Sequence, residues 1–207
     1  MFMSPRRAAA LRDGTGRTLR EHLIATAERM IAQGGTAGLT VRAIAREAGV
    51  ADGVLYNHFA DKEELLGLAL RAHVRSVEAG LHPLPEPGTG TLEENLRAYI
   101  TYGLALHRGI LPAMAGMVGR PEVMAGFAAS GVPGEDWRDR LLGYLRAERE
   151  LGRLAPGARV EAAATMIVGV CHEAVLTMLF TPPGQAPAAP EPDVDALVEV
   201  LLDGIKG

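Results

Sequence analysis

The sequence predicts an all-α protein built from two domains. Three observations predict this: apolar residues recur at helical spacing along most of the 207 residues, no segment alternates as a half-buried strand does, and one proline- and glycine-rich segment divides the chain. That segment, residues 81–90, contains three prolines and two glycines. We therefore expect an N-terminal domain over residues 18–80, preceded by a flexible basic arm over 1–17, and a C-terminal helical domain over 91–207.

The N-terminal domain is expected to begin with three helices. The first starts near Thr18, carries apolar residues at i, i+4 spacing and ends at Gly34-Gly35, since glycine commonly follows a helix C-terminus. Thr40 is a good N-cap for a short second helix that Gly49 ends. A third short helix runs over about 51–58.

Packing of the short helices predicts a helix-turn-helix. Ile44, Ala45 and Ala48 form one apolar face whose small alanines allow close helix crossing, and Leu55 with Phe59 would anchor the third helix. Such an arrangement presents the polar face of the third helix to the major groove of DNA. A fourth helix begins after residue 61, where Asp61 and Glu64 resemble a capping box.

Charge is distributed unevenly between the two halves. The chain carries a net charge of −4, but residues 1–80 hold 11 Lys or Arg against 9 Asp or Glu, net +2, while residues 81–207 hold 10 against 16, net −6. Within 1–46 the count is 8 against 3. The acidic total excludes a generally basic nucleic-acid coat protein and leaves a local basic surface open, because net charge constrains nonspecific binding rather than a site.

Residues 39–66 read LTVRAIAREAGVADGVLYNHFADKEELL, and this stretch resembles the TetR family of transcriptional regulators. The resemblance extends over roughly residues 18–70, about a third of the chain, and beyond it only the length and the number of helices fit. The matching elements, in order and spacing, are the apolar first helix, Leu39-Thr40-Val41, Ile44-Ala45, Ala48-Gly49-Val50, Leu55-Tyr56, His58-Phe59 and Lys62-Glu63-Glu64-Leu65-Leu66.

The resemblance implies binding of double-stranded operator DNA. Thr40 and Arg42 match positions that contact the DNA backbone or a base edge, and the forked donors of Arg42 suit guanine O6 and N7. Tyr56 and His58 match positions that bind phosphates, although Tyr56 can instead be a core aromatic and His58 a plain helix-end residue. Lys62 matches a lysine that approaches phosphate together with helix-terminal N–H groups.

The recognition helix also shows departures from the family pattern. Ala51 stands where a Ser or Thr often caps the helix, and Asp52 would repel any phosphate that it faced. Val54 replaces a frequent hydroxyl and can contact only apolar groups such as a thymine methyl. Gly53 permits close approach to DNA, and Asn57 can read adenine. The arginines of the arm have two interpretations: they form a solvated tail, or they insert into the minor groove of DNA.

The C-terminal domain is expected to contain helices near 91–109, 111–118, 121–129, 134–152, 157–181 and 191–205. We place Pro112 and Pro121 in first turns of helices, where the missing N–H costs no hydrogen bond. Its methionines and aromatic residues suit an apolar pocket, and the resemblance implies a small apolar effector there, although the same residues at helical spacing can be plain core. The candidate pocket residues are Tyr102, Met114, Met117, Phe127, Trp137 and His172.

The helix over 157–181 is apolar nearly all round, so it must be buried on all sides. With the amphipathic helix over 191–205 it is expected to form a two-fold four-helix interface between two copies; the alternative is a central core helix of a monomer. A homodimer would present two recognition helices about one DNA turn apart to a pseudo-palindromic operator.

Other chemistry finds no support. A single cysteine excludes a disulfide framework and a multi-cysteine zinc site, and Cys171 is expected to be a buried small hydrophobe rather than a sensor thiol. No phosphate-binding loop, nucleophile elbow or metal-binding histidine spacing occurs, so we expect no catalytic residues, no metal and no cofactor. Residues 1–10 lack a signal sequence and the longest apolar run, 162–171, is too short to span a bilayer, which predicts a cytoplasmic protein that does not enter membranes.

These observations predict a ligand-responsive DNA-binding regulator. The resemblance implies a repressor that a small apolar effector releases from its operator. The alternative from the residues is an all-α interaction module whose helix-turn-helix face binds protein.

Overall fold

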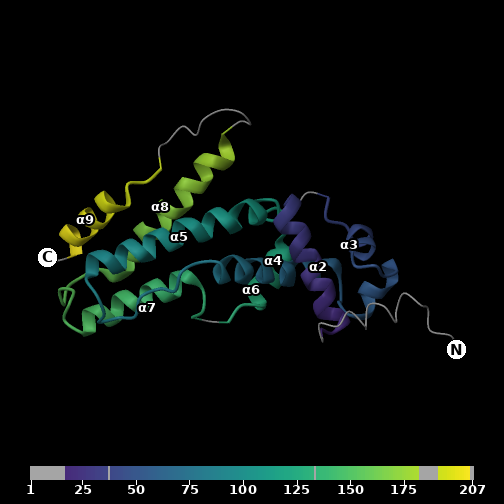
Figure 1. Cartoon of the computed structure of the whole chain (residues 1–207), viewed down its shortest axis with the longest axis horizontal. Coiled ribbons are helices and arrows are strands. Elements are labelled where there is room, and N and C mark those ends of the chain that lie inside the picture. The colour runs from purple at the N-terminus through teal and green to yellow at the C-terminus, as the bar shows by residue number, and fades with distance from the viewer. Residues whose placement is uncertain (1–16, 37, 133, 182–190, 206–207) are drawn as a thin grey trace. The chain divides into compact units, whose positions relative to one another are not determined.

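The computed structural model describes residues 17–36, 38–132, 134–181 and 191–205. Within these ranges the chain is helical and contains no strand, which confirms the all-α prediction (Figure 1). Apart from Arg17, the predicted arm lies outside the described residues, and so does most of the loop before the last helix. Two compact units form: residues up to Ala79 with Ile110–Gly131, and Gly80–Gly109 with the residues from Val132 onward.

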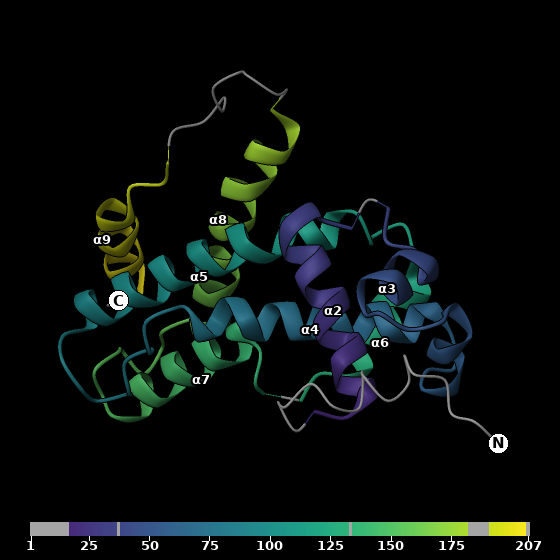
Figure 2. The same ribbon diagram turned by 45° about the vertical axis from the view of Figure 1, so that its right-hand side comes forward.

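The first unit is built on three helices and one 3₁₀ helix from the N-terminal part of the chain. They are α2 (Leu19–Gly34), α3 (Val41–Glu47), η1 (Asp52–Asn57) and α4 (Lys62–Ala79). α2 packs across α4, and α3 packs against both α2 and η1 (Figures 1 and 2). The third short helix of the sequence prediction is therefore present as a 3₁₀ helix rather than an α-helix.

Local signals in the sequence account for the ends of these helices. Thr18 forms a capping box with Glu21, and the Thr40 hydroxyl accepts a hydrogen bond from the Ala43 N–H at 3.1 Å. Gly35 and Gly49 follow the helices at φ angles of 66° and 70°, a left-handed backbone that favours glycine. The predicted caps and turns of the helix-turn-helix are confirmed.

The core of the first unit contains the predicted apolar residues. Ile44, Ala45, Ala48, Leu55 and Phe59 are buried, and they pack with the buried face of α2 and with α4. Burial of apolar area at about 25 cal/mol per Å² is the main favourable contribution to such a core. The two short helices are held in place by this core rather than by their own helical stability, which is marginal at such lengths.

Residues 110–131 belong to the same core, although they fall within the range 91–207 expected for the C-terminal domain. Ala113, Met117 and Val123 are buried among the residues of α2 and α4. α6 (Pro121–Ala129) packs on α4, and Gly67 brings the two backbones close together: a Cβ there would lie 2.7 Å from the Phe127 nitrogen. Only a tertiary contact of this kind assigns the segment to the first unit.

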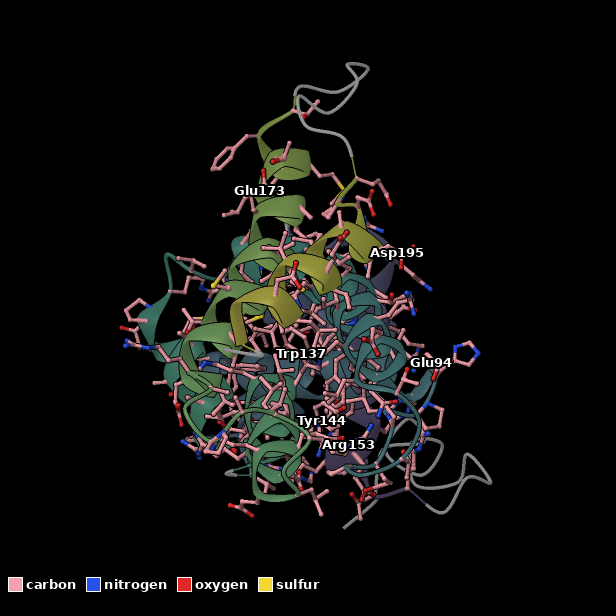
Figure 3. The ribbon with its side chains drawn as sticks, turned by 90° about the vertical axis from the view of Figure 1, so that its left-hand side faces the viewer. Glu94, Trp137, Tyr144, Arg153, Glu173 and Asp195 are labelled. Atoms are coloured by element: carbon pink, nitrogen blue, oxygen red, sulfur yellow. The ribbon has the colours of Figure 1, made fainter. Side chains whose placement is uncertain are left out.

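The second unit contains most of α5 (Leu92–Ala115) together with α7 (Trp137–Glu150), α8 (Val160–Phe180) and α9 (Val194–Ile205). α8 packs against both α7 and α9, and Figure 3 shows α8 and α9 side by side. The expected helix break before residue 111 is wrong, because α5 is continuous and Pro112 lies inside it. Ile110 and Ala113, on either side of Pro112, are buried, so packing offsets the hydrogen bond that the proline removes.

α8 is apolar over most of its surface, but the described part of the chain covers only one of its faces. Its buried face carries Ala164, Ile167, Cys171 and Val175, whereas Phe180 at its end is 81% exposed. Its other exposed large apolar residues are Met166, Leu176, Met178 and Leu179. α8 is the one helix in the described ranges long and apolar enough to cross a membrane by length and composition, which the core helices of soluble proteins also satisfy.

Candidate nucleic-acid interface

The start of α3 presents Thr40 and Arg42 to solvent. The Thr40 hydroxyl caps the helix, which fixes the direction of the first turn and of the arginine that follows. The Arg42 side chain is 90% exposed, and its Nε lies 3.5 Å from Oδ2 of Asp52. Arg42 is therefore free to extend toward a ligand, since an exposed ion pair of this kind holds it only weakly.

η1 presents a polar surface beside α3. Tyr56 is 62% exposed, and Gly53 and Asn57 are also exposed, whereas Leu55 beneath them is 3% exposed. Tyr56 is thus a surface residue, not the core aromatic of the alternative interpretation. His58 is half-buried, and its N–H and that of Phe59 donate to the Leu55 carbonyl oxygen at 3.0 Å, which closes the C-terminal end of η1.

The departures at the start of η1 have structural consequences. Ala51 stands at the N-cap and forms no side-chain capping hydrogen bond. Val54 is half-buried and packs against the core of the first unit, which limits the apolar contact that it can offer to a thymine methyl. Asp52 faces Arg42 across the turn. The sequence showed these departures but not the contact between Asp52 and Arg42.

Lys62 is the first residue of α4, and carboxylates of its neighbours cap the start of this helix. Asp61 accepts a hydrogen bond from the Glu64 N–H at 2.7 Å, and Glu64 accepts from the Ala60 N–H at 2.7 Å. Burial lowers the pKa of the Lys62 ammonium, and the neighbouring Arg120 cation lowers it further while Glu63 opposes the shift.

Two arginines hold the carboxylates beside Lys62. Arg120 pairs with Glu63 at 2.7 Å and Arg20 pairs with Glu64 at 2.7 Å. Both arginines therefore neutralise carboxylates that would otherwise repel a phosphate at this helix N-terminus. The arrangement fits the predicted role of Lys62, which is to approach a phosphate together with the first N–H groups of α4.

The six candidate pocket residues fall into two groups. Met117 is fully buried in the core of the first unit, and Met114 and Phe127 pack against the same core. Arg71 holds Phe127 there, since its guanidinium lies 4.0 Å from the ring centroid and donates to the Phe127 carbonyl oxygen at 2.9 Å. Tyr102, Trp137 and His172 belong to the second unit.

Within the second unit, Trp137 and His172 meet at a residue that the sequence analysis did not single out, His107. The His107 ring lies 5.1 Å from the Trp137 ring and 4.8 Å from the His172 ring, measured between centroids. Trp137 is buried against Gly103, where a side chain would collide with the indole. The indole Nε1 has no hydrogen-bond partner among the described residues.

His107 is buried and its protonation is set by its neighbours. Nδ1 lies 2.6 Å from the Gly103 carbonyl oxygen, which can only accept, so Nδ1 carries the proton. Burial lowers the pKa of His107, Gly103 raises it and His172 lowers it. The i, i+4 spacing of Gly103 and His107 was visible in the sequence, but the approach of Trp137 and His172 was not.

Tyr102 and His172 line separate hollows. One hollow, of about 440 Å³, lies between residues 81–84 and one face of α5 and includes Tyr102. Another, also of about 440 Å³, lies on α8 and includes His172 and Phe180. Arg140 donates to the Tyr102 hydroxyl at 3.3 Å. The single six-residue pocket stays a prediction.

Among the described residues, no group of three or more His, Cys, Asp or Glu side chains is arranged to hold a metal ion. Cys171 is a buried free cysteine, and burial raises its pKa to about 12 despite Arg108. A thiol with this pKa is almost wholly protonated at neutral pH, which fits its packing role.

Taken together, the fold and the exposed α3–η1 surface define a class: a helix-turn-helix domain joined to a helical domain. Residues 23–69 match the family model described as bacterial regulatory proteins, tetR family. This segment is therefore of the type found in the TetR family of transcriptional regulators, as the resemblance in the sequence predicted. These proteins are regulators rather than enzymes.

Solved structures share the fold along most of the chain. The multidrug binding protein EbrR complexed with ethidium has a TM-score of 0.59 at 23% identity and covers 90% of this chain and 98% of its own. FadR from Bacillus subtilis in complex with stearoyl-CoA has a TM-score of 0.52 at 23% identity, with coverages of 88% and 95%.

A third relative by structure is SmeT, the repressor of the Stenotrophomonas maltophilia multidrug efflux pump SmeDEF. Its TM-score is 0.54 at 23% identity, and 91% of each chain is covered. No curated protein matches the chain. At these identities the solved structures establish the fold and its domain order.

Proposed function

We propose that this protein is a homodimeric repressor that binds a pseudo-palindromic operator and is released by a small apolar effector. The observation that carries the proposal is the exposed α3–η1 surface, on which Arg42 is 90% exposed and Tyr56 is 62% exposed, within the stretch that matches the family model. Large polar side chains held out over a buried core are what a major-groove reader needs.

The eight predicted DNA-binding residues divide between base reading and positioning. Arg42 has forked donors that suit guanine, and Asn57 is exposed where it can read adenine. Phosphate oxygens are suited by the hydroxyl, imidazole or ammonium groups of the positioning residues, which are Thr40, Tyr56, His58 and Lys62. Gly53 is exposed and has open space around it, which permits close approach, and Val54 contributes mainly to packing.

The exposed apolar surface of α8 and α9 supports the homodimer. Leu176 is 45% exposed and Phe180 81% exposed on α8, and Val200 is 64% exposed on α9. Large apolar side chains gathered on exposed helix faces mark an interaction site in a soluble protein. A second copy with the same surface, related by two-fold symmetry, covers both patches at once. α8 also carries Glu161 and Glu173, whose charges favour burial against a second protein copy over burial in lipid. We therefore infer a cytoplasmic protein.

The second unit supports an apolar effector. Trp137 of α7, His107 of α5 and His172 of α8 form an aromatic cluster. The structural relatives include proteins complexed with ethidium and with stearoyl-CoA. The effector must bind the operator-free conformer more tightly than the bound one, because equal affinity for both shifts no equilibrium.

Gel-shift titration against the DNA flanking the protein's own gene tests the proposal. We expect salt-sensitive and sequence-selective binding that Arg42→Ala weakens by lowering discrimination between sequences by about 1–3 kcal/mol. Lys62→Ala should weaken binding to all sequences and reduce the salt slope by about one. Arg138→Ala, which removes an exposed positive charge from α7, is the matched control and should change neither.

Binding without sequence selectivity would refute the operator proposal and favour a protein-binding role for the same face. Light scattering tests the dimer: the wild type should be dimeric at micromolar concentration and Leu176→Asp monomeric. Val132→Asp, at an apolar residue 57% exposed outside α8 and α9, should stay dimeric.

A further inference from the structure

We propose that Asp52 is a second base-reading residue, which accepts a hydrogen bond from the amino group of a cytosine that is paired with, or stacked next to, the guanine that Arg42 reads. The inference rests on the proposed function and makes it more specific, since it assigns part of the operator sequence. It starts from an exposed carboxylate that lies beside Arg42 on the α3–η1 surface.

The geometry brings one donor group and one acceptor group to the same place. Asp52 Oδ2 lies 3.5 Å from Arg42 Nε, with the side chains 55% and 90% exposed. Gly49, with its φ angle of 70°, turns the chain so that the start of η1 lies beside the start of α3. Two side-chain ends this close can reach the same base pair or two that are stacked on each other, because stacked pairs are about 3.4 Å apart.

Folding does not explain the carboxylate. An exposed ion pair contributes little to stability. Asp52 forms no capping hydrogen bond for η1, and among the described residues Arg42 is its ion-pair partner. η1 has only six residues, so its helix dipole offers Asp52 little stabilisation.

On a DNA-facing surface the Asp52 carboxylate discriminates between the groups that it can contact. It repels phosphate, and it can only accept hydrogen bonds, so it needs a base edge that donates. In the major groove those donors are the amino groups of cytosine and adenine, and Asp most often accepts from cytosine N4. A guanine paired with cytosine presents two acceptors followed by a donor, which is the pattern that an arginine beside an aspartate complements.

Binding-site selection from a randomised operator half-site tests the inference, with the wild type, Asp52→Ala, Asp52→Asn and Glu47→Ala. Glu47 is an exposed carboxylate at the end of α3, so its removal controls for the lost negative charge. The wild type should select a cytosine next to or paired with a guanine. Asp52→Ala should lower the preference for that cytosine about tenfold, as the loss of one hydrogen bond to a charged group implies.

Two further variants, Asp52→Asn and the double variant Asp52→Ala with Arg42→Ala, test whether Asp52 reads the base directly. An amide both donates and accepts, so Asp52→Asn should admit adenine beside cytosine at the same position. Asp52→Ala should change the cytosine preference in an Arg42→Ala background as well. If its effect vanishes in that background, Asp52 merely orients Arg42 and the inference is wrong.

The inference is also overturned if Asp52→Ala selects the same half-site as the wild type with the same strength, or if Glu47→Ala changes the cytosine preference equally. In both cases sequence-selective binding by the wild type would leave the proposed regulator intact. If the wild type itself enriches no sequence, the proposed function and the inference fall together.

Discussion

Replacing Gly67 with alanine should push α4 and α6 apart. A Cβ at this position would lie 2.7 Å from the Phe127 nitrogen and 2.8 Å from the Gly126 carbonyl carbon. The first distance is roughly 0.7 Å short of an ordinary 3.4 Å contact. Both opposing atoms are backbone, so no side-chain rotation can relieve the overlap.

Two effects of opposite sign determine the stability of Gly67→Ala. Alanine is favoured over glycine inside a helix by about 1 kcal/mol. Overpacking of a well-packed core costs about 1–3 kcal/mol, and fixed backbone atoms place this case in the upper part of that range. We therefore expect a net loss of about 1–2 kcal/mol.

Thermal or urea unfolding followed by circular dichroism measures this loss, and Gly143→Ala is the matched control. Gly143 lies inside α7 with nothing within 4 Å of a Cβ, so alanine there should add up to about 1 kcal/mol. The two substitutions should shift the unfolding midpoint in opposite directions. A Gly67→Ala midpoint that rises as far as that of Gly143→Ala would refute the close approach of α4 and α6.

Three further predictions concern buried groups of the second unit. Glu148 is fully buried, accepts a hydrogen bond from the Gly88 N–H at 3.0 Å and pairs with Arg153. Glu148→Ala should therefore cost about 3 kcal/mol in urea unfolding and Glu148→Gln distinctly less, and equal losses would contradict the ion pair. Cys171, with its pKa raised to about 12, should react with a thiol reagent at pH 8 only after unfolding, and rapid labelling of the native protein would argue against its burial. Burial lowers the pKa of His107 in the folded state, so the unfolded state takes up the proton first as the pH falls below about 6.5. The free energy of unfolding of the wild type should therefore fall between pH 7 and pH 5, and this fall should be smaller in His107→Leu.

Local signals made the helix-turn-helix predictable. The Thr40 cap, the Gly49 turn and the apolar face of Ile44 and Ala45 each act within a few residues, and the structure confirms all of them. Pro112 shows the limit of such signals. A helix break is the local preference there, but buried neighbours on both sides hold α5 together through it.

Non-local contacts were out of reach. Composition and the family resemblance placed Met117 among the pocket candidates, with plain core as the alternative, and nothing in its spacing indicated that it would pack in the core of the first unit. Gly88 and Glu148 are 60 residues apart, and nothing in their spacing indicates a hydrogen bond between them.

The sequence by itself determined the all-α class, the helix-turn-helix and the resemblance of the N-terminal domain to the TetR family, because helical periodicity, caps and turns are properties of neighbouring residues. Only the tertiary structure decided which unit residues 110–131 join, where Trp137 meets His107, and that Asp52 faces Arg42. Those outcomes depend on which helix faces meet. The hydrophobicity of a residue indicates that it will be buried, but it does not indicate which residues it will pack against.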